Sequence, residues 1–328
     1  TLDPQAATAF NDRTGCYVGS GGGAYENQYD FFPLLTEAKG NLEQFGAELG
    51  NVVNPMWLLR TLPNNVLCHV GIKYNLKGSN ACITNHSISG TLAVIEAMEA
   101  LRNDEADRAV AVGHDAPIEP QNVMYYQRCG LLSGGDAIRP FDAARDGSLF
   151  GEGAAALTLE TEGSAKARDA KPLGEVLGGG STNEAIGLLA IREDGDGLAR
   201  AMQAALDDAG IAPAEVGMIV AHGNGTSLSD ASEAAAIARV FGAAIPPVTA
   251  FKWAFGHLIA AAGIVDAVIA LDALRDRVVP GIATLNRTAA ECAMLPLSST
   301  AQRARSDVAM ILCRGFAGTD AALLVRAL

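Results

Sequence analysis

Residues 216–226 have the sequence VGMIVAHGNGT, an apolar run that ends in a polar, glycine-rich turn. An apolar run of this length, bounded by turn residues, predicts a buried β-strand. A helix is expected soon afterwards, over residues 232–241. His222 stands at the mouth of the strand, where it can reach a bound ligand; the alternative is a turn histidine that bonds only locally. The stretch therefore predicts a strand–turn–helix unit of an α/β fold with a candidate site at the turn.

Similar units are expected along the whole chain. Further strands are expected over residues 13–19, 108–113, 154–160, 308–313 and 322–325, further helices over 88–101, 197–209 and 260–274, and a loop over 161–171. Strands that alternate with helices indicate layered α/β architecture. Because the element patterns of the two halves are alike, we expect an internal duplication, with an N-terminal half over residues 1–162 and a C-terminal half over residues 163–328.

Composition excludes several classes of function. The 328-residue chain has a net charge of −13, which argues against a nucleic-acid binder. It contains no apolar run of 18 residues, so no membrane span is expected. Its opening residues lack a secretory pattern, and the six scattered cysteines suggest buried, reduced thiols rather than a metal site, so a cytoplasmic location is expected. Thr1 is not an initiator methionine, which suggests that the numbering begins inside a longer gene product.

Three more polar segments stand where strands and helices meet. Residues 84–90, TNHSISG, place Ser87 at a helix N-terminus, where backbone N–H groups favour negative charge on a nucleophile or an oxyanion. The alternative is that Ser87 simply caps the helix.

Residues 252–257, KWAFGH, precede the helix over 260–274. The dipole of that helix should lower the pKa of His257, and Lys252, in apolar surroundings, needs a charged partner such as Asp266. The alternative is an ordinary lysine and histidine flanking a helix. Residues 315–320, GFAGTD, predict either a tight turn that exposes backbone N–H groups to a cavity or a plain glycine-rich hairpin.

Taken together, these segments resemble the β-ketoacyl-ACP synthase family of the KAS I/II type. VAHGNGTSLSD (220–230) is similar to that family's EAHGTGTxxGD segment, KWAFGHLIAAAG (252–263) to KSxxGHxxGAAG, and GFAGTD (315–320) to GFGGTN. Residues 139–153 resemble its RPFD...RDG...GEGA stretch. The resemblance implies the duplicated thiolase α-β-α-β-α sandwich and an acyltransferase of the 3-oxoacyl-ACP synthase type, active in fatty-acid or polyketide synthesis.

The resemblance also implies roles for individual residues. His222 and His257 match the histidine pair that assists decarboxylation of malonyl-ACP and stabilises the enolate, and Lys252 matches the active-site lysine. Phe316 matches the aromatic residue whose N–H helps to form the oxyanion hole and whose ring gates the acyl pocket. Asp266 stands where a glutamate is usual.

Substrates and partners follow from the same resemblance. Thr226 matches a residue that lines the phosphopantetheine arm, and Asn224 stands where the family often has threonine. No cofactor is expected beyond the phosphopantetheine arm of ACP or CoA. The expected partners are acyl carrier protein and a second subunit, in a homodimer or in a heterodimer with a paralogous ketosynthase, with the strand over residues 108–113 as a candidate contact.

Two features depart from the family pattern. The family has a cysteine followed by x-Ser-Gly, and this spacing places Ser87 at the nucleophile position; Cys82 lies five residues too early and is expected in the core. The opening strand usual in the family is absent: either the numbered chain is a fragment, or residues are missing from it, or the protein is a naturally short form. A sheet that lacks it should have an exposed edge that something must cover.

Serine at residue 87 leaves three hypotheses open. The protein condenses inefficiently or transfers an acyl group through a Ser87 ester, with His222 or His257 as base; or it is a non-condensing subunit resembling a chain-length factor; or Ser87 is an engineered replacement of cysteine. A hydroxyl is far less acidic than a thiol and needs a general base. We therefore expect Ser87 to impair condensation.

Overall fold

Two β-sheets with helices between and around them form the body of the protein, and the computed structural model describes residues 11–22 and 31–328. The first sheet, in the order β2-β1-β3-β4, consists of β1 (Thr14–Ser20), β2 (Asn80–Ile83), β3 (Arg108–Asp115) and β4 (Gly153–Glu160). The second, in the order β5-β11-β10-β6-β7, consists of β5 (Gly174–Asn183), β6 (Met218–Val220), β7 (Val248–Thr249), β10 (Val308–Gly315) and β11 (Thr319–Ala327). A small separate sheet pairs β8 (Val278–Val279) with β9 (Gln302–Arg303).

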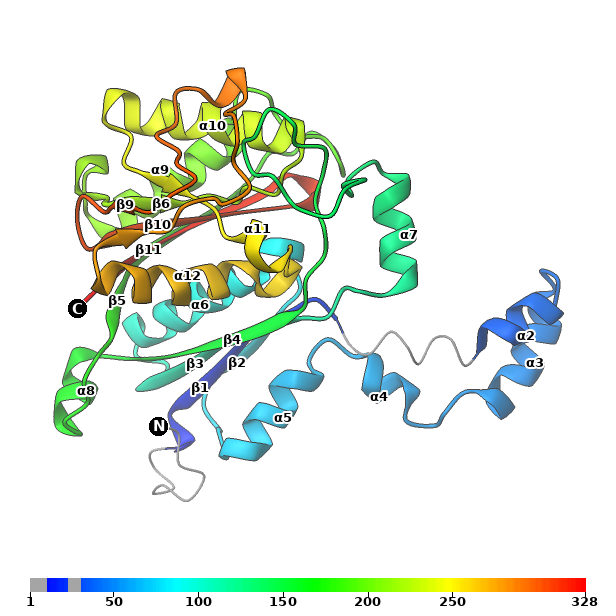
Figure 1. Ribbon diagram of the computed structural model, residues 1–328. Coiled ribbons are helices and arrows are strands. Elements are labelled where there is room, and N and C mark those ends of the chain that lie inside the picture. Colours follow the sequence, from blue (N-terminus) through cyan, green and yellow to red (C-terminus); the bar gives the residue numbers. More distant parts are fainter. Residues whose placement is uncertain (1–10, 23–30) are drawn as a thin grey trace.

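Helices fill the space between the two main sheets and cover their outer faces (Figure 1). The central layer contains α6 (Ser89–Arg102) and α12 (Ala262–Arg275). The outer face of the second sheet carries α9 (Asp196–Ala209) and α10 (Ser227–Phe241), and that of the first carries α5 (Asn65–Tyr74). The remaining helices are α2 (Phe32–Glu37), α3 (Leu42–Val52), α4 (Trp57–Thr61), α7 (Pro120–Arg128), α8 (Glu162–Ala167) and α11 (Lys252–Phe255). The expected thiolase-like α-β-α-β-α sandwich is confirmed.

The strand order of the two sheets shows an internal duplication. Strands β2, β1, β3 and β4 correspond in order to β7, β6, β10 and β11, and each pair of neighbours has the same parallel or antiparallel relation in both sheets. In each half the central-layer helix connects corresponding strands, α6 before β3 and α12 before β10. The two halves of the chain therefore have similar backbone geometry.

The second sheet has one strand more than the first. Its β5 pairs antiparallel with β11, whereas β4, the counterpart of β11, has no second partner strand among the described residues. Within the described part of the chain, the sheet edge that the sequence led us to expect without a partner is at β4. Residues 1–10, where that expectation began, lie outside the described part of the chain.

Small residues let the central helices approach the sheets closely. Ala93, Ala97, Ala267 and Ala270 on α6 and α12 are completely buried between the sheets. An alanine side chain occupies little space, so two helices and two sheets pack here with few voids. The scarcity of aromatic residues in the sequence suits this layer.

Three expectations are corrected by the structure. Residues 161–171 include the short helix α8, because the Thr161 side chain accepts a hydrogen bond from the Ser164 N–H and caps the first turn. The strand over residues 108–113 is no dimer contact, because β3 is buried and paired on both edges. Only half of the cysteines are buried: Cys68 is exposed, while Cys82 and Cys129 are partly exposed, and all six are free thiols.

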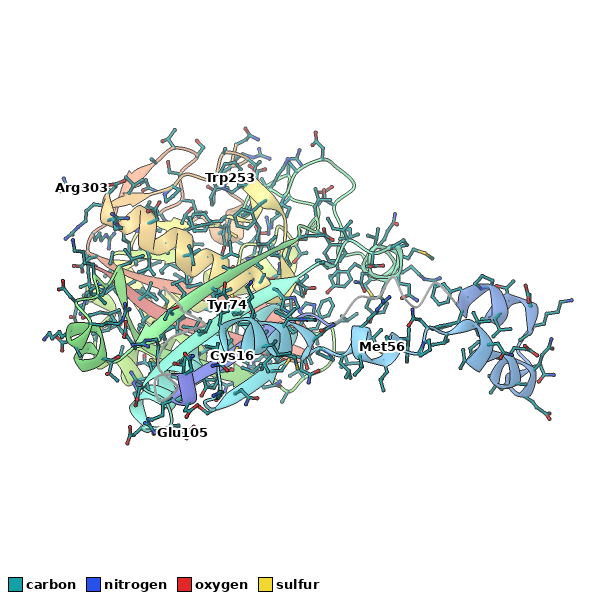
Figure 2. The ribbon with its side chains drawn as sticks, turned by 90° about the horizontal axis from the view of Figure 1, so that it is seen from below. Cys16, Met56, Tyr74, Glu105, Trp253 and Arg303 are labelled. Atoms are coloured by element: carbon teal, nitrogen blue, oxygen red, sulfur yellow. The ribbon has the colours of Figure 1, made fainter. Side chains whose placement is uncertain are left out.

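An arm formed by α2, α3 and α4 projects from the body (Figure 1), and Figure 2 shows Met56 on it. Several apolar side chains of the arm are exposed, among them Leu42 (78%) and Leu58 (58%). Exposed apolar surface of this kind is typical of contacts with another protein. No helix within the described ranges is long and apolar enough to span a membrane.

Substitution of Gly19 tests the close approach between β1 and the start of α6. A Cβ atom added at Gly19 would lie 2.4 Å from backbone atoms of Ser89 and Gly90, which cannot rotate away. We expect Gly19→Ala to lower the free energy of unfolding by about 1–3 kcal/mol, as overpacking does, measured by urea denaturation.

Gly46→Ala is the matched control. Gly46 lies in α3, and nothing stands within 4 Å of a Cβ atom built there. Alanine is the better helix former, so this variant should be neutral or more stable by about 0.5–1 kcal/mol. Equal stability of the two variants would show that β1 and α6 are not in tight contact.

Candidate active site

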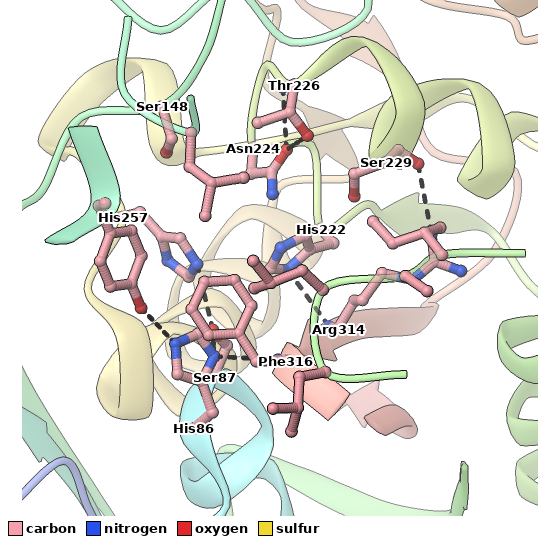
Figure 3. Close-up of a pocket in the computed structure, with 17 residues that line it drawn as sticks. His86, Ser87, Ser148, His222, Asn224, Thr226, Ser229, His257, Arg314 and Phe316 are labelled. Carbon is pink, nitrogen blue, oxygen red and sulfur yellow. Dashed lines mark hydrogen bonds between the residues drawn. The ribbon is translucent and has the colours of Figure 1, made fainter. Parts of the chain in front are cut away.

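Ser87 lies in a single 3₁₀ turn, η2 (His86–Ile88), that leads directly into α6. Capping at this turn is done by the Ser89 hydroxyl, which accepts a hydrogen bond from the Asn85 N–H at 2.7 Å. The Ser87 hydroxyl instead lies 2.9 Å from His86 Nδ1 and 3.1 Å from His257 Nε2 (Figure 3). Ser87 is completely buried and lines a cavity. The structure therefore places Ser87 among imidazoles rather than in a cap.

His222 stands at the end of β6, where the sequence predicts it. The Glu233 carboxylate on α10 accepts hydrogen bonds from the N–H groups of His222, at 2.6 Å, and Gly223, at 2.9 Å. The N–H of Arg314 donates to His222 Nδ1 at 3.3 Å. Since Nδ1 accepts this bond, the neutral ring carries its proton on Nε2.

His257 is held in the same way. Its Nδ1 accepts a hydrogen bond from the Ile259 N–H at 3.2 Å, so its proton is also on Nε2. The backbone of His257 bonds on both sides to the segment around Phe150, which comes from the other half of the chain. The ring centroids of His222 and His257 are 5.1 Å apart, so two N–H donors converge on one cavity.

Burial keeps both imidazoles neutral. It lowers the pKa of His222 and of His257 well below the ordinary histidine value, and the positive charge of Lys252 lowers both further. We expected the helix dipole to depress the pKa of His257; the largest cause is loss of hydration. Two neutral N–H donors beside a hydroxyl can stabilise negative charge on an oxygen atom.

Lys252 and Asp266 form the buried pair that we expected. Lys252 Nζ lies 3.6 Å from Asp266 Oδ2, and both side chains are almost completely buried. Neither group has a hydrogen-bond partner among the described residues. Burial raises the pKa of Asp266, while the charge of Lys252 opposes that rise.

Asn224 and Thr226 line the cavity together. The side-chain oxygen of Asn224 accepts from the Thr226 N–H at 3.0 Å and from the Thr226 hydroxyl at 2.8 Å. Below them, the Asp230 carboxylate accepts from the N–H groups of Gly225 and Phe141 and so ties this turn to the segment over residues 139–153. These four hydrogen bonds therefore hold the turn in place.

Phe316 lies in η7 (Phe316–Gly318), a turn between β10 and β11 in which Ala317 adopts a φ of 61°. Its N–H donates to His86 Nδ1 at 3.4 Å, and its ring stacks on that of His86 with centroids 4.3 Å apart. The N–H that we expected in an oxyanion hole is thus engaged by His86.

Among the cavity-lining residues that the sequence did not single out are His86, Tyr126 and Arg314. His86 carried a signal, because a polar ring directly precedes the nucleophile position. Arg314 carried a weaker one, since a charge at the end of the apolar strand needs partners, here Asp320 at 2.9 Å and Glu184 at 3.4 Å. Tyr126 gave none, because its α7 turns toward the site only in the folded protein.

Cys82 lies on β2 and does not line the cavity. Across residues 11–22 and 31–328, no group of three or more histidine, cysteine, aspartate and glutamate side chains is arranged to hold a metal ion.

Comparison with known proteins agrees with this geometry. The N-terminal domain of β-ketoacyl synthases matches residues 2–165, and the C-terminal domain of the same family matches residues 173–286. The chain belongs to the β-ketoacyl synthase family. It is similar to 3-oxoacyl-[acyl-carrier-protein] synthase 2 of Rhizobium meliloti (strain 1021), with 33% identity over 95% of this chain and 74% of the relative.

Two solved structures of ketosynthases have the same fold. The ishigamide ketosynthase/chain length factor superimposes with a TM-score of 0.86 at 28% identity, covering 97% of this chain and 76% of its own. A type II PKS acyl-carrier protein in complex with its ketosynthase, bound to the hexaketide, gives 0.86 at 25% identity, covering 99% and 80%. The present chain is thus a ketosynthase-like protein with serine at residue 87.

The proton positions on the two imidazoles can be tested by NMR. We expect ¹⁵N shifts of His222 and His257 to report neutral rings protonated on Nε2 at pH 7 and still at pH 5, because burial lowers both pKa values. In a urea-unfolded sample the same rings should charge near pH 6.5. A ring that is charged at pH 7, or protonated on Nδ1, would contradict the hydrogen bonds described above.

Global stability is a poor substitute for this measurement. The low pKa values of the buried histidines make the protein less stable as pH falls below about 6.5. Burial raises the pKa of Asp230 to about 7 and that of Asp320 to about 6, and these carboxyls act in the opposite direction over the same range. Because the two effects have opposite signs over the same pH range, a probe of the individual rings is the decisive measurement.

Proposed function

We propose that this protein acts in fatty-acid or polyketide synthesis by accepting an acyl group from ACP or CoA onto Ser87, and that it condenses slowly. The observation that carries the proposal is the position of the Ser87 hydroxyl, within hydrogen-bond distance of His86 Nδ1 and His257 Nε2. A hydroxyl between a proton acceptor and a proton donor is the arrangement that activates serine nucleophiles.

The remaining residues have roles in the same proposal. The N–H groups of His222 and His257 stabilise the enolate oxygen that forms when malonyl-ACP loses carbon dioxide. Lys252, paired with Asp266, favours neutral rings, so each ring keeps Nδ1 as an acceptor and its one proton on Nε2. Phe316 supplies its N–H to the acyl carbonyl and its ring gates the pocket.

Substrate delivery uses the turn at Asn224 and Thr226, which we propose contacts the phosphopantetheine arm of ACP or CoA. The protein requires no cofactor beyond that arm in this scheme. An acidic carrier protein must dock on a local basic patch, since the net charge of −13 opposes its approach. One solved ketosynthase with this fold has its acyl-carrier protein bound, which supports the same partner here.

Serine limits the condensing step for two reasons. A hydroxyl stays protonated at neutral pH, so every acylation needs a base, whereas a thiol is partly ionised by itself. An ester is also a poorer acyl donor to a carbanion than a thioester. Acyl transfer is therefore the faster of the two reactions in this proposal.

An acyl ester on Ser87 is the direct test. We expect incubation with acetyl-CoA or acetyl-ACP to add one acetyl group, located on the peptide that contains Ser87 by mass spectrometry. Ser87→Ala should remove the adduct and leave thermal unfolding unchanged. A labelled Cys82 or Cys68 with an unlabelled Ser87 would refute acyl transfer through serine.

A second candidate function is a non-condensing subunit like a chain-length factor. The observation that favours it is the Phe316 N–H, which is engaged by His86 instead of standing free for an oxyanion. The ishigamide ketosynthase/chain length factor has the same fold. The exposed apolar side chains of the α2–α4 arm support a second subunit in either case, a homodimer or a heterodimer with a paralogous ketosynthase.

The chain divides into two halves in the same proposal. We propose that residues 1–162 form the half that carries the nucleophile and residues 163–328 the half that carries the His222, Lys252 and His257 site. The change from the first sheet to the second, between β4 and β5, supports that division.

Ser87→Cys separates the two candidate functions. If the site processes acyl groups, a thiol at residue 87 should raise condensation of acetyl-ACP with malonyl-ACP by orders of magnitude, because it needs no base. Product formation is measured by mass spectrometry of the β-ketoacyl-ACP. The control is Ser87→Cys combined with His257→Ala, which should condense slowly.

The opposite result has a clear meaning. A Ser87→Cys protein that is acylated at cysteine but never condenses would favour the non-condensing subunit. Co-purification with a cysteine-bearing paralogue expressed from the same operon would then support a heterodimer. A stable homodimer with turnover excludes it.

A further inference from the structure

His86 is fixed in an unusual position directly before Ser87. Its backbone has a φ of 48°, the left-handed region that non-glycine residues rarely adopt, so the surrounding structure must hold it there. Its ring is nearly parallel to those of Phe316 and Tyr126, with centroids 4.3 and 6.2 Å away, and the centroids of those two rings are 5.1 Å apart. Its Nε2 contacts the Tyr126 hydroxyl. Every edge of the ring that carries a nitrogen therefore has a partner.

The hydrogen bonds decide which nitrogen of His86 carries the proton. The Phe316 N–H donates to Nδ1, so Nδ1 is the bare nitrogen and Nε2–H donates to the Tyr126 oxygen. The lone pair of Nδ1 is then available to the Ser87 hydroxyl at 2.9 Å.

His257 has the opposite orientation toward Ser87. Its Nδ1 accepts from Ile259, so the nitrogen that faces Ser87 carries a proton and donates to the hydroxyl oxygen. His222 also carries its proton on Nε2, because its Nδ1 accepts from the Arg314 N–H. Neither ring can remove the Ser87 proton in this tautomer, although the sequence suggested both as bases.

We propose, resting on the acyl-transfer function above, that His86 is the general base that activates Ser87 and that Tyr126 orients it. The substrate is an acyl thioester. The Ser87 Oγ attacks the carbonyl carbon while its proton moves to His86 Nδ1. The C–S bond then breaks, and the proton passes from Nδ1 to the departing sulfur. The products are the Ser87 ester and a free thiol, with no oxidant or other reactant.

Proton transfer also releases the Phe316 N–H. A single lone pair on Nδ1 is shared by the Ser87 hydroxyl and the Phe316 N–H in the resting site. Once Nδ1 is protonated it can no longer accept, so the Phe316 N–H becomes available to the oxyanion that forms at that moment. His86 thus couples activation of the nucleophile to completion of the oxyanion hole.

The electrostatic setting suits a base that stays unprotonated. Burial lowers the pKa of His86 to about 4, so its Nδ1 is free to accept at neutral pH. The titratable groups that face it are Tyr126 on α7 and the rings of His222 and His257; Lys252 supplies the positive charge behind those two. Burial raises the pKa of Tyr126, so its hydroxyl stays neutral over the same range.

The experiment measures how fast Ser87 reacts with two probes, acetyl-CoA and an alkyl fluorophosphonate. The fluorophosphonate forms a Ser87 O–P bond and loses fluoride, so it reports the nucleophile even if the protein does not accept thioesters. We expect His86→Ala to slow both reactions by about 10²–10⁴-fold, the usual contribution of a general base. Tyr126→Phe keeps the ring stack and should slow them less.

The matched control tests His86→Ala in a protein that also carries Ser87→Cys. A thiol ionises without help, so acetylation of Ser87→Cys should change little when His86→Ala is added, or rise because the Phe316 N–H is freed. Added imidazole should partly rescue His86→Ala in the serine protein only. The fluorophosphonate rate of the unaltered protein should be flat from pH 8 to 5 and fall below about pH 4. A merely structural residue would show neither the rescue nor the dependence on residue 87.

Each result has a defined meaning. If His86→Ala reacts as fast as the unaltered protein or faster, His86 is an occluding side chain and the proposal is wrong. If fluorophosphonate labels Ser87 in a His86-dependent way but acetyl-CoA does not, the general base stands and the acyl-transfer function fails. If neither probe labels Ser87 in the folded protein, activation of Ser87 is refuted, and with it the role of His86.

Discussion

Backbone-to-backbone contact at the start of α6 determines the geometry of the whole site. Gly19 on β1 lets this turn approach the sheet, and Gly90 lets it approach the carbonyl of Ala260, which a Cβ atom at Gly90 would meet at 2.6 Å. Ala260 lies three residues after His257, so the same contact that packs the central layer brings the two halves of the chain together at Ser87. Larger residues at these glycines would separate the hydroxyl from the imidazole, because a backbone contact cannot be relieved by a side-chain rotation.

Three histidines in this site have fixed proton positions, because a backbone N–H group donates a hydrogen bond to the Nδ1 atom of each one. Arg314, Ile259 and Phe316 provide those groups, from β10, η5 (Ile259–Ala261) and η7. All three rings have the same tautomer, yet two present Nε2–H to the cavity and the third presents a bare Nδ1 to Ser87. The difference arises from where each ring is attached: His86 approaches from the turn that carries the nucleophile, and the other two approach from the opposite half.

The sequence predicts the layered fold and some of the polar residues that line the cavity, because apolar strands that end in glycine-rich polar turns limit the paths the chain can take. Ser87, His222 and His257, which the motifs single out, line one cavity, whereas Lys252 and Asp266 form a buried pair that is not part of its lining. The hydrogen bonds of these side chains could not be predicted from the sequence. The tautomer of His257 depends on a backbone N–H two residues away, and the partner of His86 is Tyr126, forty residues distant on a helix whose own pattern gives no sign of the site. The short helix α8 escaped prediction because it depends on one cap at Thr161, not on an apolar face.

Replacing a thiol with a hydroxyl changes which neighbour matters most. A thiol at residue 87 would draw on the helix N-terminus for ionisation, and a small, inert side chain at residue 86 would suffice. A hydroxyl cannot ionise that way, because a helix dipole changes a pKa by far less than separates serine from neutral pH. It needs a nitrogen lone pair at hydrogen-bond distance, and His86 is the ring whose tautomer provides one. The same ring engages the Phe316 N–H, so a site with serine at residue 87 and histidine at residue 86 is inactive toward an oxyanion until the proton moves. In the proposed mechanism these two adjacent residues keep the Phe316 N–H engaged until the hydroxyl attacks, and the N–H groups of His222 and His257 are unaffected.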